Sequence, residues 1–204
     1  FSVTATAPYL EEAKVAAEGY IGPIIIEVDM NNLIDDGIIA KPKLRFLKAP
    51  INLEIKKLRK YPEVYEAAVV ESRSRNKLIV FEAFRLMEEE KLTSLIIVSR
   101  IEHGKKLETM AAVFFPSLKI EFVQGATDSE TRNTIKEKLQ EGELDCAIAT
   151  AVFKEGIDIP SLGAVINAAG GKSEIATLQA IGRGLRTFKE KKDVIIIDII
   201  DTNH

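Results

Sequence analysis

The feature that most constrains the fold is a regular alternation of short apolar runs with segments of helical spacing. The apolar runs have the length of buried strands, and apolar residues recur every three or four positions between them. The runs are residues 94–98, 118–122, 146–150, 164–168 and 194–200. Strands that alternate with helices in this way form a mostly parallel sheet with helices on its faces. The sequence therefore predicts an α/β fold of the three-layer sandwich type.

Polar residues gather after the strands predicted at 146–150 and 164–168. Ligands of an open parallel sheet bind beyond the carboxyl ends of its strands. Arg183 and Arg186 are three positions apart in a helical segment, so their guanidinium groups lie on one face. Two planar cations aimed together suit a polyphosphate better than a single carboxylate. The other polar residues or glycines of this group are Thr150, Gly156, Asp158 and Gln179.

Five segments resemble the motifs of superfamily 2 helicases, in the same order along the chain. Thr150-Ala-Val-Phe-Lys-Glu-Gly-Ile-Asp158 resembles motif V, and Gln179-Ala-Ile-Gly-Arg-Gly-Leu-Arg186 resembles motif VI. Residues 1–8 are similar to motif III, residues 99–103 to motif IV and Gln124-Gly125 to motif IVa. The resemblance covers essentially the whole chain and implies a RecA-like second motor domain. A motif VI that begins with glutamine points to the branch of XPB-like, UvsW-like and restriction-enzyme motors.

The resemblance also implies a role for each motif residue. In this family ATP lies between two RecA-like domains, and the second domain supplies arginines that neutralise charge on the transferring phosphoryl group. Arg183 and Arg186 match these catalytic arginine fingers. The remaining roles are nucleotide binding by Gly156, Asp158 and Gln179, nucleic-acid binding by Ser99, Arg100, Gly125 and Thr150, and coupling by Thr4 and Thr6. The implied cofactors are ATP and Mg²⁺ in the full-length enzyme, with none bound by this chain alone and no metal site in it.

The resemblance divides the chain into three parts and names its partners. Residues 1–20 match a remnant of the first RecA-like domain, residues 21–50 the connection between domains, and residues 51–204 the second RecA-like domain. The expected partners are nucleic acid, with DNA favoured over RNA, and the first RecA-like domain of the same polypeptide. No apolar run approaches the roughly 20 residues of a membrane span, so no membrane partner is expected. A cytoplasmic protein, or a nuclear one in a eukaryote, is implied.

Composition limits how nucleic acid can be bound. The net charge is -3, so binding must rest on local basic surface. The candidate basic groups are Lys41, Lys43, Arg45 and Lys48; Lys56, Lys57, Arg59 and Lys60; and residues 189–192. Cys146 is the only cysteine and lies in an apolar strand, which predicts a buried, unreactive thiol. One cysteine and two histidines are too few for a zinc site.

Local patterns predict how individual elements begin and end. Glycines mark the ends of helices at 9–18, 30–35 and 127–141, where they are Gly19, Gly37 and Gly142. Strands are expected at 1–7, 23–28 and 43–47, the last half-buried, and Pro62 is expected to break a helical stretch at 51–71. A helix at 77–90 is apolar nearly all round and should be buried. Ser99-x-x-Glu102 and Thr127-x-x-Glu130 match capping boxes, although Ser99 fits a nucleic-acid contact equally well.

Several other functions are weighed against this interpretation. Gly171-Lys-Ser173 looks like the end of a phosphate-binding P-loop, but Ile166 stands where that pattern needs a glycine. A Rossmann-type enzyme is disfavoured because no Gly-x-Gly-x-x-Gly follows any strand. The motor subunit of a restriction enzyme, and a non-catalytic nucleic-acid-binding RecA-like module, stay open as alternatives.

Overall fold

The computed structural model describes residues 11–23, 29–51, 55, 58–123, 129–150, 159, 161–170 and 193–201. The chain divides into two compact units, Phe1–Ile38 and Ile39–His204. The domain boundaries predicted at residues 20 and 50 stay a prediction. The strands predicted at 1–7 and over most of 23–28, and the capping residue Thr127, lie outside the described residues.

The described residues of the first unit form two helices, α1 (Glu11–Ile21) and α2 (Met30–Asp35). The predicted end of the first helix at Gly19 is wrong, because α1 continues through it. The helix ends at Ile21, and the next residue, Gly22, has φ +91° and donates its amide to the Glu18 carbonyl at 2.9 Å. A left-handed residue at this position satisfies a terminal carbonyl, and only glycine adopts it freely. The prediction for α2 is confirmed, and Gly37 follows it with φ +69°.

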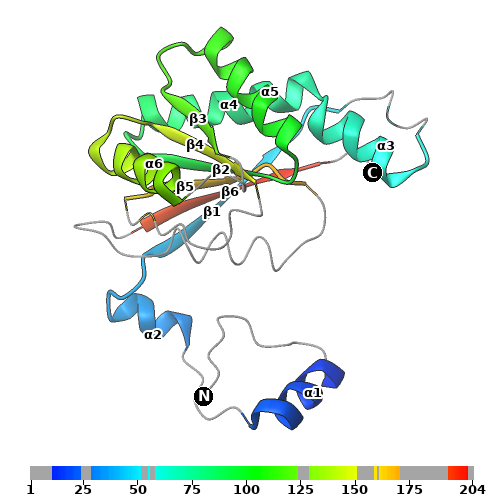
Figure 1. Ribbon diagram of the computed structural model, residues 1–204, viewed down its shortest axis with the longest axis vertical. Coiled ribbons are helices and arrows are strands. Elements are labelled where there is room, and N and C mark those ends of the chain that lie inside the picture. The colour runs from blue at the N-terminus through cyan, green and yellow to red at the C-terminus, as the bar shows by residue number, and fades with distance from the viewer. Residues whose placement is uncertain are drawn as a thin grey trace. The chain divides into compact units, whose positions relative to one another are not determined.

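The second unit is built on one six-stranded sheet (Figure 1). Its strands are β1 (Lys41–Lys48), β2 (Ser94–Val98), β3 (Ile120–Val123), β4 (Cys146–Thr150), β5 (Ala164–Asn167) and β6 (Asp193–Ile200). They lie in the order β1-β6-β5-β2-β4-β3, and every pairing among them is parallel. The predicted α/β class with a parallel sheet is confirmed. β1, which the sequence placed in the connection between domains, is an edge strand of this sheet.

The described helices of this unit are α3 (Tyr61–Tyr65), the π-helix η2 (Glu66–Val70), α4 (Arg73–Glu88), α5 (Ile101–Phe114) and α6 (Ser129–Glu141). Figure 1 shows α4 and α5 together on one face of the sheet. The prediction that Pro62 breaks a helix is wrong. Pro62 lies in the first turn of α3. Proline is tolerated there because the amide that it lacks would have no partner within the helix.

Alternating side chains of the strands separate two hydrophobic cores. In β4, Ile148 points into the core under α4 and α5, whereas its neighbour Ala147 points into the core that includes Ile135 of α6. Two helical layers therefore cover opposite faces, which is the predicted three-layer arrangement. Gly104 lets α5 approach the sheet, since a Cβ atom there would come 2.2 Å from the Phe122 ring.

The helix α4 is buried on one side only, which corrects the prediction that it is buried all round. It begins at Arg73, one turn before the predicted start, and ends at Glu88. Ile79 and Val80 are fully buried, whereas Phe81 is 46% exposed. The helix has one neighbouring layer, the sheet with α5, so the Phe81 side is left facing outward.

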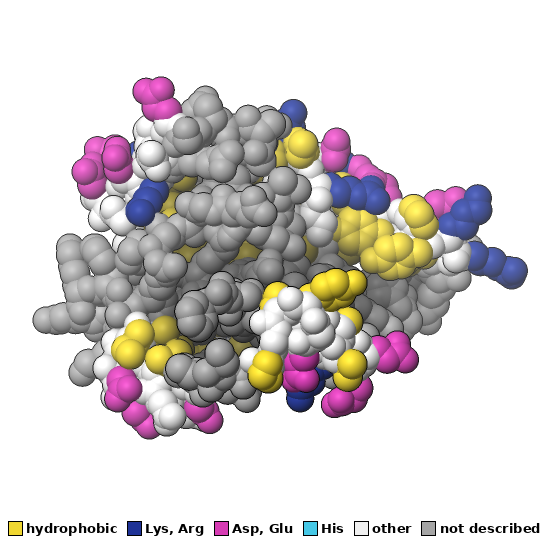
Figure 2. All heavy atoms as spheres, turned by 60° about the horizontal axis from the view of Figure 1, so that its bottom comes forward, with side chains coloured by type: hydrophobic (Ala, Val, Ile, Leu, Met, Phe, Trp, Pro, Cys, Tyr) yellow, Lys and Arg dark blue, Asp and Glu magenta, His cyan; other side chains and the backbone are white. Residues whose placement is uncertain are grey.

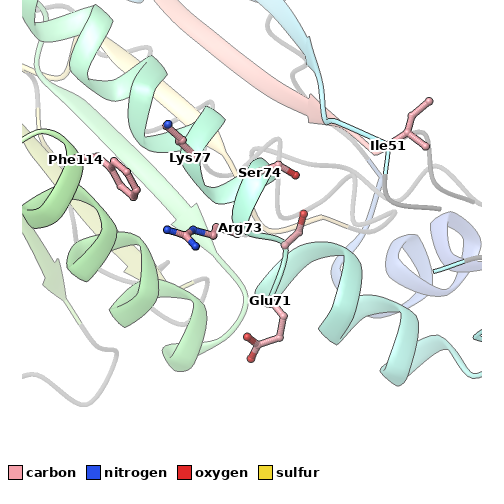
Figure 3. Close-up of a pocket in the computed structure, with 7 residues that line it drawn as sticks. Ile51, Glu71, Arg73, Ser74, Lys77 and Phe114 are labelled. Carbon is pink, nitrogen blue, oxygen red and sulfur yellow. The ribbon is translucent and has the colours of Figure 1, made fainter. Parts of the chain in front are cut away.

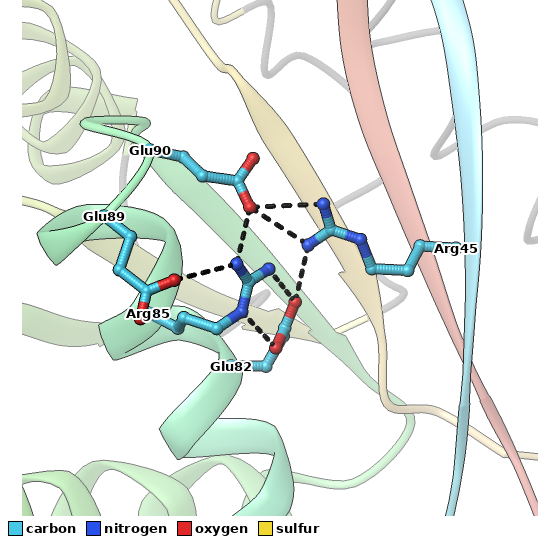
Figure 4. Close-up of polar contacts among 5 residues, drawn as sticks. All are labelled: Arg45, Glu82, Arg85, Glu89 and Glu90. Atoms are coloured by element: carbon cyan, nitrogen blue, oxygen red, sulfur yellow. Dashed lines mark hydrogen bonds and ion pairs between the residues drawn. The ribbon is translucent and has the colours of Figure 1, made fainter.

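The edge strand β1, which the sequence predicts to be half-buried, exposes two of its apolar side chains. Its alternation is as predicted, but Leu44 and Phe46 are 63% and 59% exposed. The covered face carries Arg45, which donates to Glu82 of α4 at 2.9 Å and to Glu90 at 3.1 Å (Figure 4). Helix α4 lies over this face of β1. The carboxylates of Glu82 in α4 and of Glu90 just after it favour a charged side chain over an apolar one at this position.

Glu82 joins two arginines in this network (Figure 4). Its side chain is 5% exposed and also accepts two hydrogen bonds from Arg85, at 2.6 and 2.9 Å. Burial disfavours the charged carboxylate, but the hydrogen bonds from Arg85 and Arg45 outweigh it and lower the pKa of Glu82 below its usual range. Glu82 therefore stays ionised, and Arg45 is not free to bind nucleic acid as part of the predicted basic surface.

Cys146 has the environment that the sequence predicted. It lies in the core at β4 with no exposed surface. Burial raises the pKa of the Cys146 thiol to about 12, so the thiol stays protonated at neutral pH. The predicted burial of the cysteine is confirmed, and a buried protonated thiol is a poor nucleophile.

Candidate functional site

The carboxyl ends of the strands form one edge of the sheet, because the strands are parallel. Ser99 follows β2 directly, and Thr150 ends the adjacent β4, where it pairs with Val98. Ala168 follows β5 and donates its amide to the Ile97 carbonyl at 2.9 Å. Asp201 follows β6. Polar groups from four strands are thus brought to the edge where such sheets bind ligands.

Arg75 links the start of α4 to the ends of β5 and β6. Its Nε and Nη2 atoms donate to the two carboxylate oxygens of Asp201 at 2.7 and 3.1 Å. Its Nη1 atom donates to the Ala168 carbonyl at 3.1 Å. The side chains are 1% and 10% exposed, so this bidentate pair is buried. We call Arg75, Asp201 and Ala168 the edge clamp.

Two further side chains hold the next residue of the segment that leaves β5. The hydroxyl groups of Tyr65 and Ser99 both donate to the Ala169 carbonyl, the second at 3.4 Å. Burial raises the pKa of Tyr65, so its hydroxyl stays protonated and able to donate. Gly170 then takes φ +65°, and an added Cβ there would lie 3.1 Å from Val69. Residues 168–170 are therefore held by contacts from α3, from α4 and from Ser99 after β2. They come immediately before residues 171–192.

Arg100 makes its described contacts within the domain. Its guanidinium forms an ion pair with Glu66 and lies 4.8 Å from the centre of the Tyr65 ring. The two charged side chains are 39% and 41% exposed. An ion pair this exposed contributes less than about 1 kcal/mol, so Glu66 holds the guanidinium only weakly.

A buried histidine is linked to the π-helix η2 through the side chain of Asn76. His103 Nε2 lies 2.9 Å from Asn76 Oδ1, and Asn76 Nδ2 donates to the Val70 carbonyl at 2.9 Å. His103 has no exposed surface, and its Nδ1 atom has no hydrogen-bond partner within the described residues. Burial, with smaller effects from the charges of Arg75 and Lys106, lowers the pKa of His103 to about 3. The imidazole is therefore neutral.

This neutral histidine predicts a loss of stability in mild acid. The unfolded state takes up a proton at a pKa near 6.5, and the folded state does not until the pH is far lower. Stability is complete above pH 6.5 and falls as the pH drops below it. Between pH 7.5 and 5.0 the loss is about 2 kcal/mol in the free energy of unfolding. Urea unfolding at both pH values measures it. His103→Gln should show almost no change over this interval, and an equal loss in the variant would contradict the assignment.

The structure places only part of the predicted site. Ser99 and Thr150 lie at the ends of adjacent strands, and Thr150 is 6% exposed. The capping-box prediction for Ser99 is wrong, because the N-cap residue of α5 is Arg100 and the Ser99 hydroxyl bonds to Ala169 instead. The predicted residues outside the described part of the chain are Thr4, Thr6, Gly125, Gly156, Asp158, Gln179, Arg183 and Arg186.

Sequence reasoning missed the edge clamp and Tyr65. One signal was present, since Asp201 directly follows an apolar strand in a parallel sheet, the position typical of ligand-edge residues. Arg75 was missed because the helix was predicted to begin at Lys77, which left the arginine in a loop. Its partner is 126 residues away along the chain, and no local pattern reports that contact.

The surface of the described residues is mixed in charge and holds no metal-ligand cluster. In Figure 2 the described acidic and basic side chains are interspersed on the visible face, with no broad field of one sign. Over the described residues, no group of three His, Cys, Asp or Glu side chains could hold a metal ion. None of the described helices is long and apolar enough to cross a membrane.

Comparison with known proteins identifies relatives of the chain. The T4 phage protein named ATP-dependent DNA helicase uvsW is 31% identical over 189 residues, which are 90% of this chain and 37% of that protein. The crystal structure of T4 UvsW superimposes with a TM-score of 0.63 and 30% identity over 79% of this chain and 32% of that one. The DNA 3'-5' translocase XPB2 of Sulfurisphaera tokodaii is 30% identical over 115 residues, 56% of this chain and 24% of that protein.

The chain therefore spans about a third of the length of T4 uvsW. A DEAD box protein from Methanococcus jannaschii shares the fold, with a TM-score of 0.54 and 21% identity over 98% of this chain and 44% of that one. The family described as helicase conserved C-terminal domain matches residues 59–188, which is more than half of the chain. This chain belongs to that family and is a RecA-like C-terminal domain of a superfamily 2 helicase.

Proposed function

We propose that this chain is the C-terminal motor half of an ATP-dependent helicase or translocase that acts on DNA. The observation that carries the proposal is the edge clamp with its hydroxyl partners. It holds residues 168–170, which lead directly into the segment with the motif VI residues Gln179, Arg183 and Arg186. A rigid support at this point suits arginines that must reach across a cleft to a phosphoryl group.

The two arginines complete the ATP site in this proposal. Arg183 and Arg186 stabilise the negative charge that develops on the transferring phosphoryl group. Gly156, Asp158 and Gln179 line the nucleotide on the same side. The chain carries no P-loop, so the first RecA-like domain would hold the phosphates and Mg²⁺, which neutralises phosphate charge when bound. Thr4 and Thr6 couple the two domains. In the proposed division of the chain at residues 20 and 50, both belong to the remnant of the first RecA-like domain.

Nucleic acid follows the ends of β2, β3 and β4 in this proposal. Ser99, Arg100, Gly125 and Thr150 belong to the segments that leave these strands. Hydroxyl and main-chain N–H groups contact phosphates without reading sequence. The relatives named above are a DNA helicase and a DNA translocase, which favours DNA over RNA. Unwinding, branch migration or annealing of DNA strands is the activity that such contacts would serve.

An ATPase comparison tests the proposal. The 204-residue chain alone should show no DNA-stimulated ATP hydrolysis, because it lacks the phosphate cradle. A polypeptide that joins it to the first RecA-like domain should turn over ATP at roughly 1 per second or faster when DNA is added, within the usual enzyme range. Turnover by the chain alone at that rate, or a two-domain protein that ignores DNA, would contradict the proposed function.

A further inference from the structure

A depression of about 760 Å³ opens beside the first turn of α4 (Figure 3). It is lined by residues 71–74 and Lys77 at the start of α4, by Phe114 at the end of α5, and by Ile51 after β1. We call it the α4 pocket. None of its residues belongs to the helicase motifs recognised in the sequence.

Two cations of the α4 pocket are exposed and have no carboxylate partner among the residues that the structure describes. Arg73 and Lys77 extend toward Phe114, with the Arg73 guanidinium carbon 6.0 Å and the Lys77 ammonium 4.8 Å from the ring centre (Figure 3). Within the described parts of the chain neither forms an ion pair. By contrast, Arg75 and Arg85, on the same helix, are both paired with carboxylates. The aromatic ring keeps the two charges together without neutralising them.

The start of α4 adds unused hydrogen-bond donors. The helix has 16 residues, and no acidic residue lies in its first turn. Its N-cap Ser72 makes no capping hydrogen bond, although it is only 7% exposed and lines the pocket. Across the described residues the Ser72 hydroxyl has no other partner. The first amides of a helix also have no partner within it and carry its positive partial charge.

The one carboxylate among the described residues that line the α4 pocket already has a partner. Glu71 forms an ion pair with Lys106 of α5. The remaining field is that of two cations, a helix N-terminus and a nearly buried hydroxyl. This donor set is the one that proteins use for a phosphate group.

We propose that the α4 pocket binds a backbone phosphate of a nucleic-acid strand. The inference rests on the proposed function in one respect, since it assumes that the chain binds nucleic acid at all. Phe114 favours a strand over a free phosphate ion. It is 37% exposed beside the cations, and an aromatic ring next to a positive groove is the arrangement on which bases of single strands stack. The pocket would be a contact additional to the motif residues.

Paired double variants test the α4 pocket. The pocket variant is Arg73→Gln with Lys77→Gln. The control is Lys105→Gln with Lys119→Gln, which removes the same charge from two other exposed cations. Binding of the 204-residue chain to a fluorescent oligo-dT is measured by anisotropy between 50 and 200 mM salt (roughly the range over which phosphate contacts weaken). All four positions are exposed, so the melting temperatures should agree with that of the unmodified chain.

The pocket variant should bind oligo-dT about tenfold more weakly at low salt than the control does. The slope of log K against log salt should fall by about 1.4, the value for two lost phosphate contacts on a single strand. Equal losses in both variants, with binding retained, would overturn the pocket alone. Failure of the unmodified chain to bind oligo-dT would overturn both this inference and the nucleic-acid part of the proposed function.

A second measurement separates a strand from a free phosphate ion. Backbone amide shifts of the unmodified chain are followed by NMR during titration with oligo-dT and, separately, with inorganic phosphate. The amides of residues 73–77 should move at micromolar oligo-dT (an order-of-magnitude expectation for weak nucleic-acid binding) and much less with phosphate. Saturation by inorganic phosphate without any response to oligo-dT would overturn the assignment to nucleic acid.

Discussion

Replacement of Arg183 or Arg186 by alanine is expected to lower DNA-stimulated ATP turnover by about 100-fold or more, in a polypeptide that carries both motor domains. The reason is that the guanidinium would stabilise charge that develops only in the transition state. Nucleotide affinity and folding should therefore change little. The measurement is kcat beside the melting temperature for each variant. Arg→Lys should restore little activity, because an ammonium lacks the planar fork.

A structural role for these arginines would give the opposite pattern. If they only formed exposed ion pairs, each replacement would cost less than about 1 kcal/mol of stability. Turnover of the folded enzyme would then be nearly intact. A variant that melts earlier but keeps most of its kcat would contradict the arginine-finger proposal and leave the family assignment in place.

Asp201→Asn is expected to lower the free energy of unfolding by about 3 kcal/mol or more. The substitution keeps the shape of the side chain but removes the charge that balances Arg75. Arg75 has no exposed surface and cannot turn to solvent for a substitute. Breaking one side of a buried pair is costly because the remaining charge stays desolvated. Urea unfolding of the 204-residue chain at pH 7.5 measures the loss.

The same strand offers a matched control. Asp193, at the start of β6, pairs with Lys43 at 2.6 Å, but the two side chains are 40% and 61% exposed. Asp193→Asn removes the same charge and should cost less than about 1 kcal/mol. If both variants lost equal stability, the edge clamp would not be what holds residues 168–170 after β5. If the clamp also positions residues 171–192, Asp201→Asn should lower kcat in the two-domain polypeptide more than Asp193→Asn does.

Much of the fold could be predicted from the sequence because periodicity reports burial directly. Four of the five apolar runs became strands within one residue at each end, and β3 was displaced by two residues at its start. A strand in a parallel sheet is buried on both faces and therefore consists of consecutive apolar residues. Such a run can be recognised from the residues of the strand alone. Gly37 and Gly142 were recognised as helix ends for a similar reason, since a positive φ favours glycine whatever surrounds it.

The predicted site depended on the order of motifs rather than on contacts. Ser99 was proposed from its match to motif IV, and Thr150 from motif V and its place at the end of a predicted strand. The same reasoning could not find Tyr65 or Arg75, because each acts on a backbone carbonyl of residues 168–169 from a helix far away in sequence. Ser99 was weighed equally as a helix cap and as a nucleic-acid contact; the cap is wrong, because its hydroxyl contacts the Ala169 carbonyl.

The sequence by itself determined the α/β class, the succession of most elements, the buried thiol of Cys146 and the helicase family. Only the tertiary structure decided which polar groups meet. Arg45 is covered and Leu44 is exposed because α4 brings Glu82 over one face of β1. Arg75 and Asp201 pair because the start of α4 and the end of β6 reach the same edge of the sheet. The burial of apolar side chains follows the short periodicity of strands and helices, which can be read from a few consecutive residues. An ion pair between distant elements depends on how those elements pack, and no local repeat encodes it.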